Sequence, residues 1–151
     1  MTEYRKYPVS TTGMPPGIPY IISNEAAERF SFYGMKAALA IFLANYLGVL
    51  GGSNLTETEA TSYVSWFNTA VYLTPLLGAI IADAFFGKYR TIVSLSIVYC
   101  LGHLCLALMG VGGVVQFWLL GGLGLISLGA GGIKPCVSAH VGDQFGAKNQ
   151  C

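Results

Sequence analysis

Four long apolar segments are the feature that most constrains this chain. They run from about Tyr20 to Leu47, Ala60 to Phe86, Thr91 to Met109 and Val114 to Val137. Each is close in length to the roughly 20 residues that a helix needs to cross the hydrocarbon core of a bilayer. Only 10% of the 151 residues are charged, whereas an average soluble domain has about 25%. The sequence therefore predicts an all-α membrane protein with four transmembrane helices and the lipid bilayer as a partner.

Lysine and arginine outside the apolar segments predict the orientation of the chain. Arg5 and Lys6 precede the first segment, Lys88 and Arg90 lie between the second and third, and Lys148 follows the fourth. The other two connections contain neither residue type. The positive-inside rule then places both chain ends in the cytoplasm, with residues 1–19 as a cytoplasmic tail. The net charge of +1 argues against a nucleic-acid partner, which would require a basic face.

The sequence contains no pattern typical of a metal site or of an enzyme. Its four cysteines form no C-x-x-C pair and have no zinc-type spacing with histidine. There is no G-x-S-x-G turn, and the sequence FFGKY departs from a phosphate-binding loop because Ala82 replaces the first glycine. The connection after the first segment contains a glycosylation sequon at Asn54 and the capping-box spacing Thr56-x-x-Glu59. We therefore expect a protein that is not an enzyme and binds no metal.

The first apolar segment contains four charged residues that cannot all face lipid. At about 100° per residue they fall on one helical stripe about 100° wide, and they are Glu25, Glu28, Arg29 and Lys36. Each central charge costs about 2.5 to 3.5 kcal/mol on insertion into a membrane. The stripe should therefore face a water-filled cavity or another helix, with Arg29 paired to Glu25 or Glu28. Two interpretations stay open: an ion-pair network that fixes packing, or a proton and substrate pathway, which intramembrane carboxylates favour.

The fourth segment contains a single lysine, Lys134, between a glycine-rich stretch and Pro135. Small residues permit close approach of helices, and a proline can open the helix next to it. Such a lysine can extend to the lipid headgroups, or it can point into the protein interior. We predict the second arrangement, in which Lys134 reaches Glu25 or Glu28 and can exchange that carboxylate for another one.

Three sequence motifs resemble those of the proton-dependent oligopeptide transporter family, within the major facilitator superfamily. EAAERFSFYGM resembles E-x-x-E-R-F-x-Y-Y-G, and GAGGIKPCVSAHVGDQF resembles the family's second signature, which contains G-G-I-K-P and D-Q-F. GAIIADAFFGKYRT resembles the superfamily's loop motif between the second and third helices. The resemblance implies that residues 20–151 are the first four helices of an N-terminal six-helix bundle. It also implies a proton-driven carrier of di- and tripeptides in the inner or plasma membrane, without a cofactor.

The resemblance further implies roles for individual residues. Proton coupling is assigned to Glu25, Glu28, Arg29 and Lys134. Substrate binding is assigned to Arg29, Tyr33, Lys36, Tyr72 and Lys134, and a gating loop to Asp83, Lys88 and Arg90. The position of Tyr72 also suits a packing tyrosine, and Lys88 with Arg90 would also suit a cytoplasmic anchor. Phe32 replaces the first tyrosine of the family's motif, so one hydroxyl is missing from the implied peptide site.

The number of apolar segments departs from the family's pattern. The family has about twelve membrane helices in two six-helix halves, with the substrate between the halves. We therefore expect this chain to be the N-terminal part of a longer carrier and not to transport alone. Two alternatives stay open: a family member that carries nitrate or another small anion, and a four-helix assembly subunit without transport activity. Further apolar spans encoded after Cys151 would favour the carrier.

Overall fold

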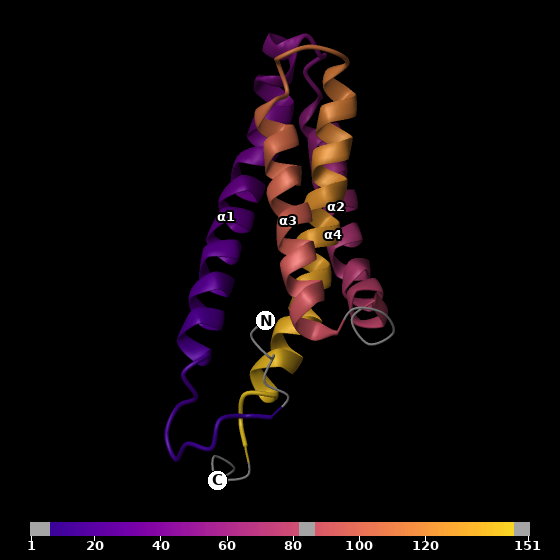
Figure 1. Cartoon of the computed structure of the whole chain (residues 1–151). Coiled ribbons are helices and arrows are strands. Elements are labelled where there is room, and N and C mark those ends of the chain that lie inside the picture. The colour runs from indigo at the N-terminus through magenta and orange to yellow at the C-terminus, as the bar shows by residue number, and fades with distance from the viewer. Residues whose placement is uncertain (1–6, 82–86, 147–151) are drawn as a thin grey trace.

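The computed structural model describes residues 7–81 and 87–146, and over those ranges its regular elements are all helices. The elements are α1 (Ile18–Asn45), the short 3-10 helix η1 (Leu47–Leu50), α2 (Glu57–Ile81), α3 (Lys88–Ala107) and α4 (Val115–Gly142). In Figure 1 the connections after α1 and after α3 lie at one end of the molecule, and the start of α1 and the end of α4 lie toward the other. The predicted all-α fold with four long helices is confirmed. Arg5, Lys6 and Lys148, on which the predicted orientation depends, lie outside the described residues.

Two of the described helices are both long enough and apolar enough to cross a membrane. These are α3 and α4, whose best 18-residue windows have mean hydropathies of 1.5 and 1.4. Helices α1 and α2 contain 28 and 25 residues, which at 1.5 Å per residue is also enough to span a bilayer core. Their apolar surface is interrupted, however, by the charges of α1 and the many hydroxyl residues of α2. All four helices are thus long enough to span a bilayer core, but only α3 and α4 also have a high mean hydropathy.

Local sequence explains where the helices begin. Pro19 lies in the first turn of α1, where its missing N–H is not needed. The predicted capping box precedes α2: the Thr56 N–H donates to the Glu59 carboxylate at 2.9 Å, and the Glu59 N–H donates to Thr56 Oγ1 at 3.3 Å. The bond from the Thr56 backbone lowers the pKa of the Glu59 carboxyl, and the Thr56 hydroxyl adds to the effect. Gly87 has a φ of 74° before α3, a conformation that favours glycine.

Helix α4 is the centre of the described bundle because it packs against both α3 and α2. Its buried residues include Leu119, Leu123 and Ile126, and all five residues of 129–133 are buried, so this stretch is covered on every side. At Gly129 the backbones of α3 and α4 are so close that an added Cβ would lie 2.6 Å from the Tyr99 Cβ. On the α2 side, the Thr74 hydroxyl donates to the Ser127 carbonyl oxygen at 2.8 Å. Small residues therefore bring three helices into close contact.

Candidate functional site

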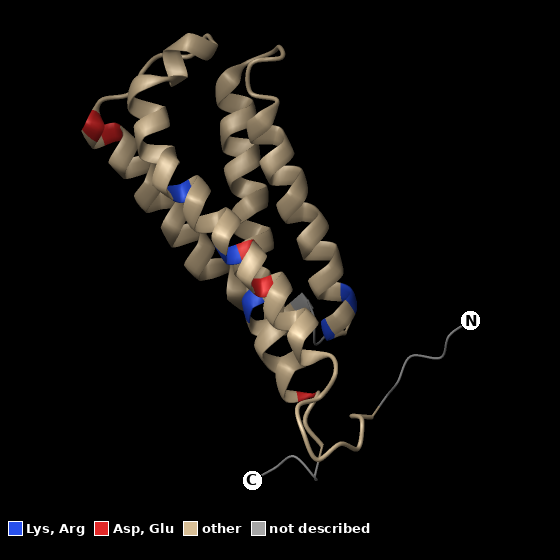
Figure 2. Ribbon diagram, turned by 90° about the vertical axis from the view of Figure 1, so that its left-hand side faces the viewer, with Lys and Arg blue, Asp and Glu red and all other residues tan. Residues whose placement is uncertain are grey.

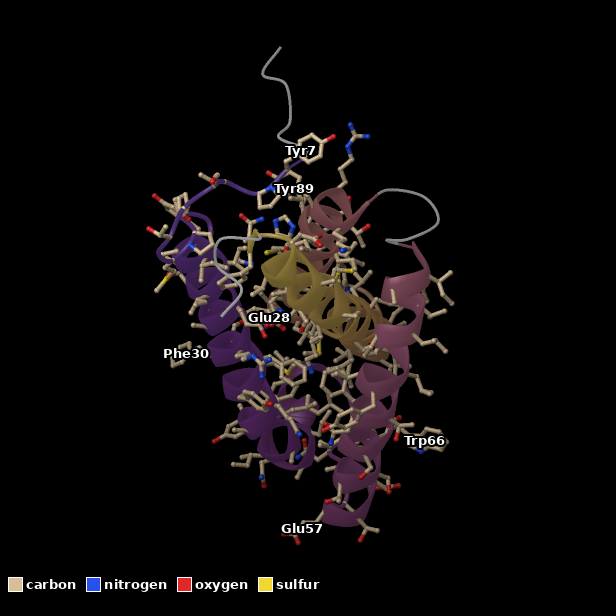
Figure 3. All side chains as sticks on the ribbon, turned by 90° about the horizontal axis from the view of Figure 1, so that it is seen from below. Tyr7, Glu28, Phe30, Glu57, Trp66 and Tyr89 are labelled. Carbon is tan, nitrogen blue, oxygen red and sulfur yellow. The ribbon has the colours of Figure 1, made fainter. Side chains whose placement is uncertain are left out.

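The predicted charged stripe of α1 divides into an ion pair and a carboxylate that faces the interior. Arg29 Nε donates to Glu25 Oε1 at 2.9 Å, one turn apart on the same helix. Glu28 points between α1 and α4, whereas Phe30 lies on the outer surface of α1 (Figure 3). Phe30 is 86% exposed. Figure 2 shows charged positions along the middle of the bundle and near its ends, with long uncharged stretches between them. Within the stripe, Glu25 and Arg29 are therefore paired with each other, whereas Glu28 is turned toward α4.

Lys134 of α4 projects toward the same space. Its ammonium nitrogen lies 5.6 Å from the centre of the Phe32 ring on α1, a distance suited to a cation–π contact. It also interacts electrostatically with the Glu28 carboxylate. Within the described parts of the chain, no ion pair of 4.0 Å or less joins Lys134 to Glu25 or Glu28. The lysine thus lies beside the charged stripe, with its charge over an aromatic ring in place of a direct pair.

Phe32 is the residue that organises this part of the site. It is buried, and its ring packs against Phe67 of α2 with centroids 5.8 Å apart. It also contacts the Tyr33 ring edge-on at 5.5 Å. The position where the family motif has a tyrosine hydroxyl therefore holds an apolar surface that touches α2 and supports the ammonium of Lys134. At this position the chain therefore has a cation–π contact with Lys134 and no side-chain hydroxyl.

The other predicted substrate residues lie on more open surfaces. Tyr33 is 55% exposed and Tyr72 is 78% exposed, while Lys36 is half-buried. Among the residues that the structure describes, neither Lys36 nor Tyr72 is brought into a hydrogen bond or an ion pair. The described helices therefore bring together Glu25 with Arg29 and Lys134 with Glu28, and Tyr33 lies one turn from Arg29 on α1. Lys36 and Tyr72 stay apart from these groups.

An ion pair joins the start of α3 to the residue that follows α4. Lys88 Nζ lies 3.0 Å and 2.8 Å from the two carboxylate oxygens of Asp143, which follows the end of α4. The partner expected in the gating loop, Asp83, lies outside the described residues, and Arg90 is exposed. Sequence reasoning missed Asp143 as a site residue. The signal was available, because Asp143 is the aspartate of the D-Q-F ending in the second signature.

A second missed cluster lies between α1 and α3. The Ser31 hydroxyl is 3.1 Å from Nε2 of His103, and the Tyr99 hydroxyl donates to the Glu28 carbonyl oxygen at 3.2 Å. The only signal in the sequence was a histidine within an apolar segment. Residues 7–81 and 87–146 contain no group of three or more histidine, cysteine or acidic side chains that could hold a metal ion.

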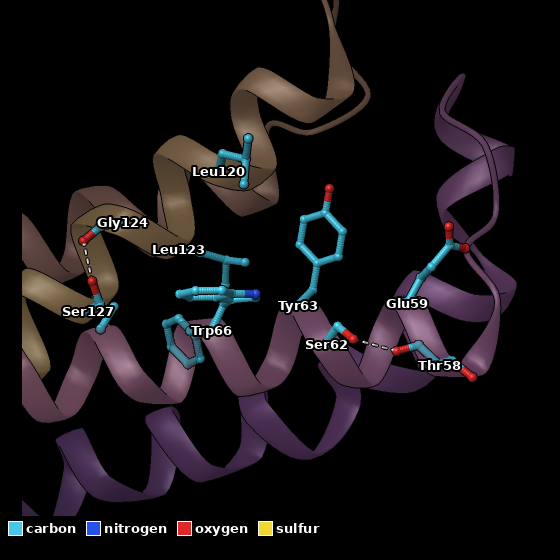
Figure 4. A pocket seen from close by; sticks show the side chains of 11 residues that line it. Thr58, Glu59, Ser62, Tyr63, Trp66, Leu120, Leu123, Gly124 and Ser127 are labelled. Carbon is cyan, nitrogen blue, oxygen red and sulfur yellow. Dashed lines mark hydrogen bonds between the residues drawn. The ribbon is translucent and has the colours of Figure 1, made fainter.

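An apolar hollow lies between α2 and α4, away from the charged stripe of α1, with Glu59 in its wall (Figure 4). It has a volume of about 510 Å³ and is lined mainly by apolar groups such as Trp66, Leu120 and Leu123. The hydroxyls of Ser62 and Ser127 in its wall donate to carbonyl oxygens of their own helices, each at 2.9 Å. None of the predicted site residues lines it. The hollow therefore suits an apolar occupant and is separate from the charged site.

Comparison with known proteins places the three motifs in a family. The PTR2 model of the POT family matches residues 89–150. Solute carrier family 15 member 2 of Danio rerio is 46% identical over 143 residues, which are 91% of this chain and 19% of the relative. The chain belongs to the POT family. It spans about a fifth of the length of that curated relative.

Solved structures of POT family proteins agree with the fold. The POT family transporter PepTSo, in a crystal structure obtained in meso, is 48% identical and superposes with a TM-score of 0.79 over 91% of this chain and 26% of its own. A mutant of the peptide transporter POT, crystallised in complex with alafosfalin, is 30% identical with a TM-score of 0.79, over 95% of this chain and 29% of its own. These proteins are transporters, and POT transporters are integral membrane proteins. The charged helix α1 therefore belongs to a membrane fold.

Proposed function

We propose that this chain is the N-terminal part of a longer carrier that couples the inward movement of di- and tripeptides to protons. Family membership supports transport, and one of the similar structures is described as a peptide transporter. The observation in the chain itself that supports coupling is the position of Lys134 over Phe32, close to Glu28. The similar proteins named above favour peptide transport over the small-anion and assembly alternatives.

The coupling step follows from opposite charges on facing helices. An ionised Glu28 attracts the ammonium of Lys134 across the space between α1 and α4. When a proton neutralises Glu28, this attraction is lost, and Lys134 can bind the carboxylate of a peptide. Because no direct pair within 4.0 Å holds Lys134 to a carboxylate in the described chain, the exchange needs no full separation of a buried ion pair. Such a separation would cost about 3 to 5 kcal/mol.

The remaining charges and tyrosines take supporting parts in this proposal. Glu25 holds Arg29 through the i, i+4 pair, so the Arg29 guanidinium is oriented along α1. Arg29, Tyr33, Lys36 and Tyr72 would line the peptide path together with Lys134. At the cytoplasmic end, the pair between Lys88 and Asp143 would hold one conformation of the carrier, with Arg90 and Asp83 in the same loop motif. The coupling ion is the proton, and no cofactor is required.

The test of coupling is the substitution Glu28→Gln in the complete carrier, reconstituted in liposomes. We expect it to abolish uptake of a dipeptide driven by a proton gradient and to leave counterflow exchange partly intact. Exchange requires only that the loaded site reorients, whereas uphill uptake also requires a group that titrates. Glu57→Gln is the matched control, because Glu57 is exposed at the start of α2. Full gradient-driven accumulation by the Glu28 variant would refute the coupling role.

The orientation is tested separately by labelling. In the proposed topology both chain ends face the cytoplasm of a cell with this protein in its inner or plasma membrane, and the connection between α1 and α2 faces outward. Ser53 lies exposed in that connection. A cysteine introduced there by Ser53→Cys should react with a membrane-impermeant maleimide added from outside. Reaction only after the cytoplasmic face is opened would reverse the topology.

A further inference from the structure

A polar cluster joins α1 to α3 in a way that the proposed coupling step does not use. Ser31 Oγ lies 3.1 Å from His103 Nε2, and His103 Nδ1 lies 3.3 Å from the Tyr99 carbonyl oxygen. The Tyr99 hydroxyl donates to the Glu28 carbonyl oxygen at 3.2 Å and is within hydrogen-bonding reach of the Ser31 side chain. The imidazole and phenol rings pack with centroids 4.5 Å apart. A continuous series of polar groups therefore leads from His103 to the backbone of Glu28.

The hydrogen-bond partners determine which nitrogen of the neutral imidazole carries hydrogen. A backbone carbonyl can only accept, so Nδ1 of His103 must be the N–H that donates to Tyr99. Nε2 then accepts a hydrogen bond from the Ser31 hydroxyl. This arrangement satisfies both nitrogens of the neutral ring and leaves the lone pair of Nε2 facing a hydroxyl, a group that can reverse its direction.

One additional proton can be taken up by reversing that single hydroxyl. The proton comes from water and forms one N–H bond at Nε2 of His103, and no other covalent bond changes. The new N–H donates to Ser31 Oγ, whose own hydrogen then turns to the phenol oxygen of Tyr99. The hydrogen of Tyr99 remains on the Glu28 carbonyl oxygen. The cluster is therefore satisfied in both protonation states, which a histidine held by two backbone carbonyls would not be.

The cluster lies on the outer side of Glu28 in the proposed orientation. Ser31 is three residues beyond Glu28 along α1, which is about 4.5 Å of helix rise. His103 is four residues before Ala107, where α3 ends. Figure 1 shows that this end of α3 lies at the end of the bundle opposite the start of α1. A proton that enters from outside would meet His103 before it meets Glu28.

We propose that His103, Ser31 and Tyr99 form a second proton-binding site of the carrier, coupled to Glu28. The proposal rests on the proposed function in that Glu28 is taken as the coupling carboxylate. The titratable groups around the cluster are Glu28 of α1, Tyr99 and Cys100 of α3, and Lys134 of α4, which acts on Glu28. A proton on His103 attracts the carboxylate form of Glu28, and a proton on Glu28 removes this attraction. The two sites therefore favour holding one proton between them.

The experiment is ¹⁵N NMR of the imidazole, recorded on the complete carrier in lipid nanodiscs. The resonances of His103 are assigned as those that disappear in His103→Gln. We expect hydrogen on Nδ1 alone at high pH, and a second N–H at Nε2 as the pH is lowered. Adding Glu28→Gln should weaken proton binding at His103 about threefold, a midpoint change of about 0.5 pH unit. Glu57→Gln, at the exposed start of α2, should leave the midpoint unchanged.

Either of two results would overturn the proposal. His103 that stays neutral from about pH 5 to about pH 9 is a packing residue, and a midpoint that is equal with and without Glu28→Gln shows no coupling. If the Glu28→Gln variant does not fold, Glu28→Met makes the same comparison, because it also removes the carboxylate and leaves His103, Ser31 and Tyr99 in place. The titration needs no substrate. Suppose that the midpoint of His103 depends on Glu28 but the carrier takes up no peptide. This result would reject the proposed function and would support the second proton-binding site.

Discussion

Two interfaces of α3 are built on opposite principles. Toward α4 the contact is between backbones, and at Gly129 there is no room even for a Cβ beside Tyr99 and the Leu95 carbonyl. Toward α1 the described contact is carried by side chains, through Ser31 with His103 and Tyr99 with the Glu28 carbonyl. Close backbone packing depends on shape and has one arrangement. Hydrogen bonds between hydroxyl and imidazole groups depend on protonation, so the α1 side of α3 is the side that can respond to pH.

The largest expected effect comes from breaking the backbone interface. Gly129→Val should destabilise the protein by about 3 kcal/mol, because overpacking a close-packed core forces backbone shifts. Gly124→Val is the matched control on the same helix, since an added Cβ there meets nothing within 4 Å. Thermal unfolding in detergent, followed by circular dichroism, measures the difference. Equal midpoints for the two variants would mean that α3 and α4 are not held together by shape.

A smaller effect is expected where α1 meets α4. Phe32→Leu removes the ring beneath the Lys134 ammonium and part of a buried surface. We expect a loss of about 1 to 2 kcal/mol from the cation–π contact and the lost apolar area. Phe30→Leu, on the outer face of α1 and 86% exposed, controls for the same change of residue type. The same unfolding assay would contradict the role of Phe32 if both variants matched the wild type.

The smallest effect is expected for the ion pair where α3 begins and α4 ends. Lys88→Gln removes the ion pair to Asp143, in which both side chains are partly exposed to solvent. Such pairs contribute about 0.2 to 1 kcal/mol and weaken with salt. The wild type and the variant should therefore converge in stability at high salt. A large loss that persists in about 1 M salt would show that charge, and not shape, joins α3 to α4.

The sequence predicted the features that are set within a single helix, namely the length of each helix and the contacts between residues one turn apart. Segment length gave the four helices, and the spacing of Glu25 and Arg29 gave their i, i+4 pair. It also placed Lys134 on the side facing α1, although the direct pair to a carboxylate is not formed in the described chain. The side-chain pairs between different helices could not be predicted from the sequence, because they depend on how far one helix is shifted along its neighbour. Asp143 with Lys88, and Ser31 with His103, are 55 and 72 residues apart, and nothing local in the chain relates them.

The unequal hydropathy of the helices also has a consequence for biogenesis. Helices α3 and α4 are apolar enough to enter a bilayer, and the glycine-rich helix α4 packs closely against α3, so they can insert as a hairpin. Helix α1 leaves the ribosome before α3 and α4, with four charges on one side. Those charges oppose independent insertion by about 10 kcal/mol if all four are central. Helix α1 would therefore wait at the translocon until a later helix covers its charged face, so that it is made before α3 and α4 but enters the membrane after them.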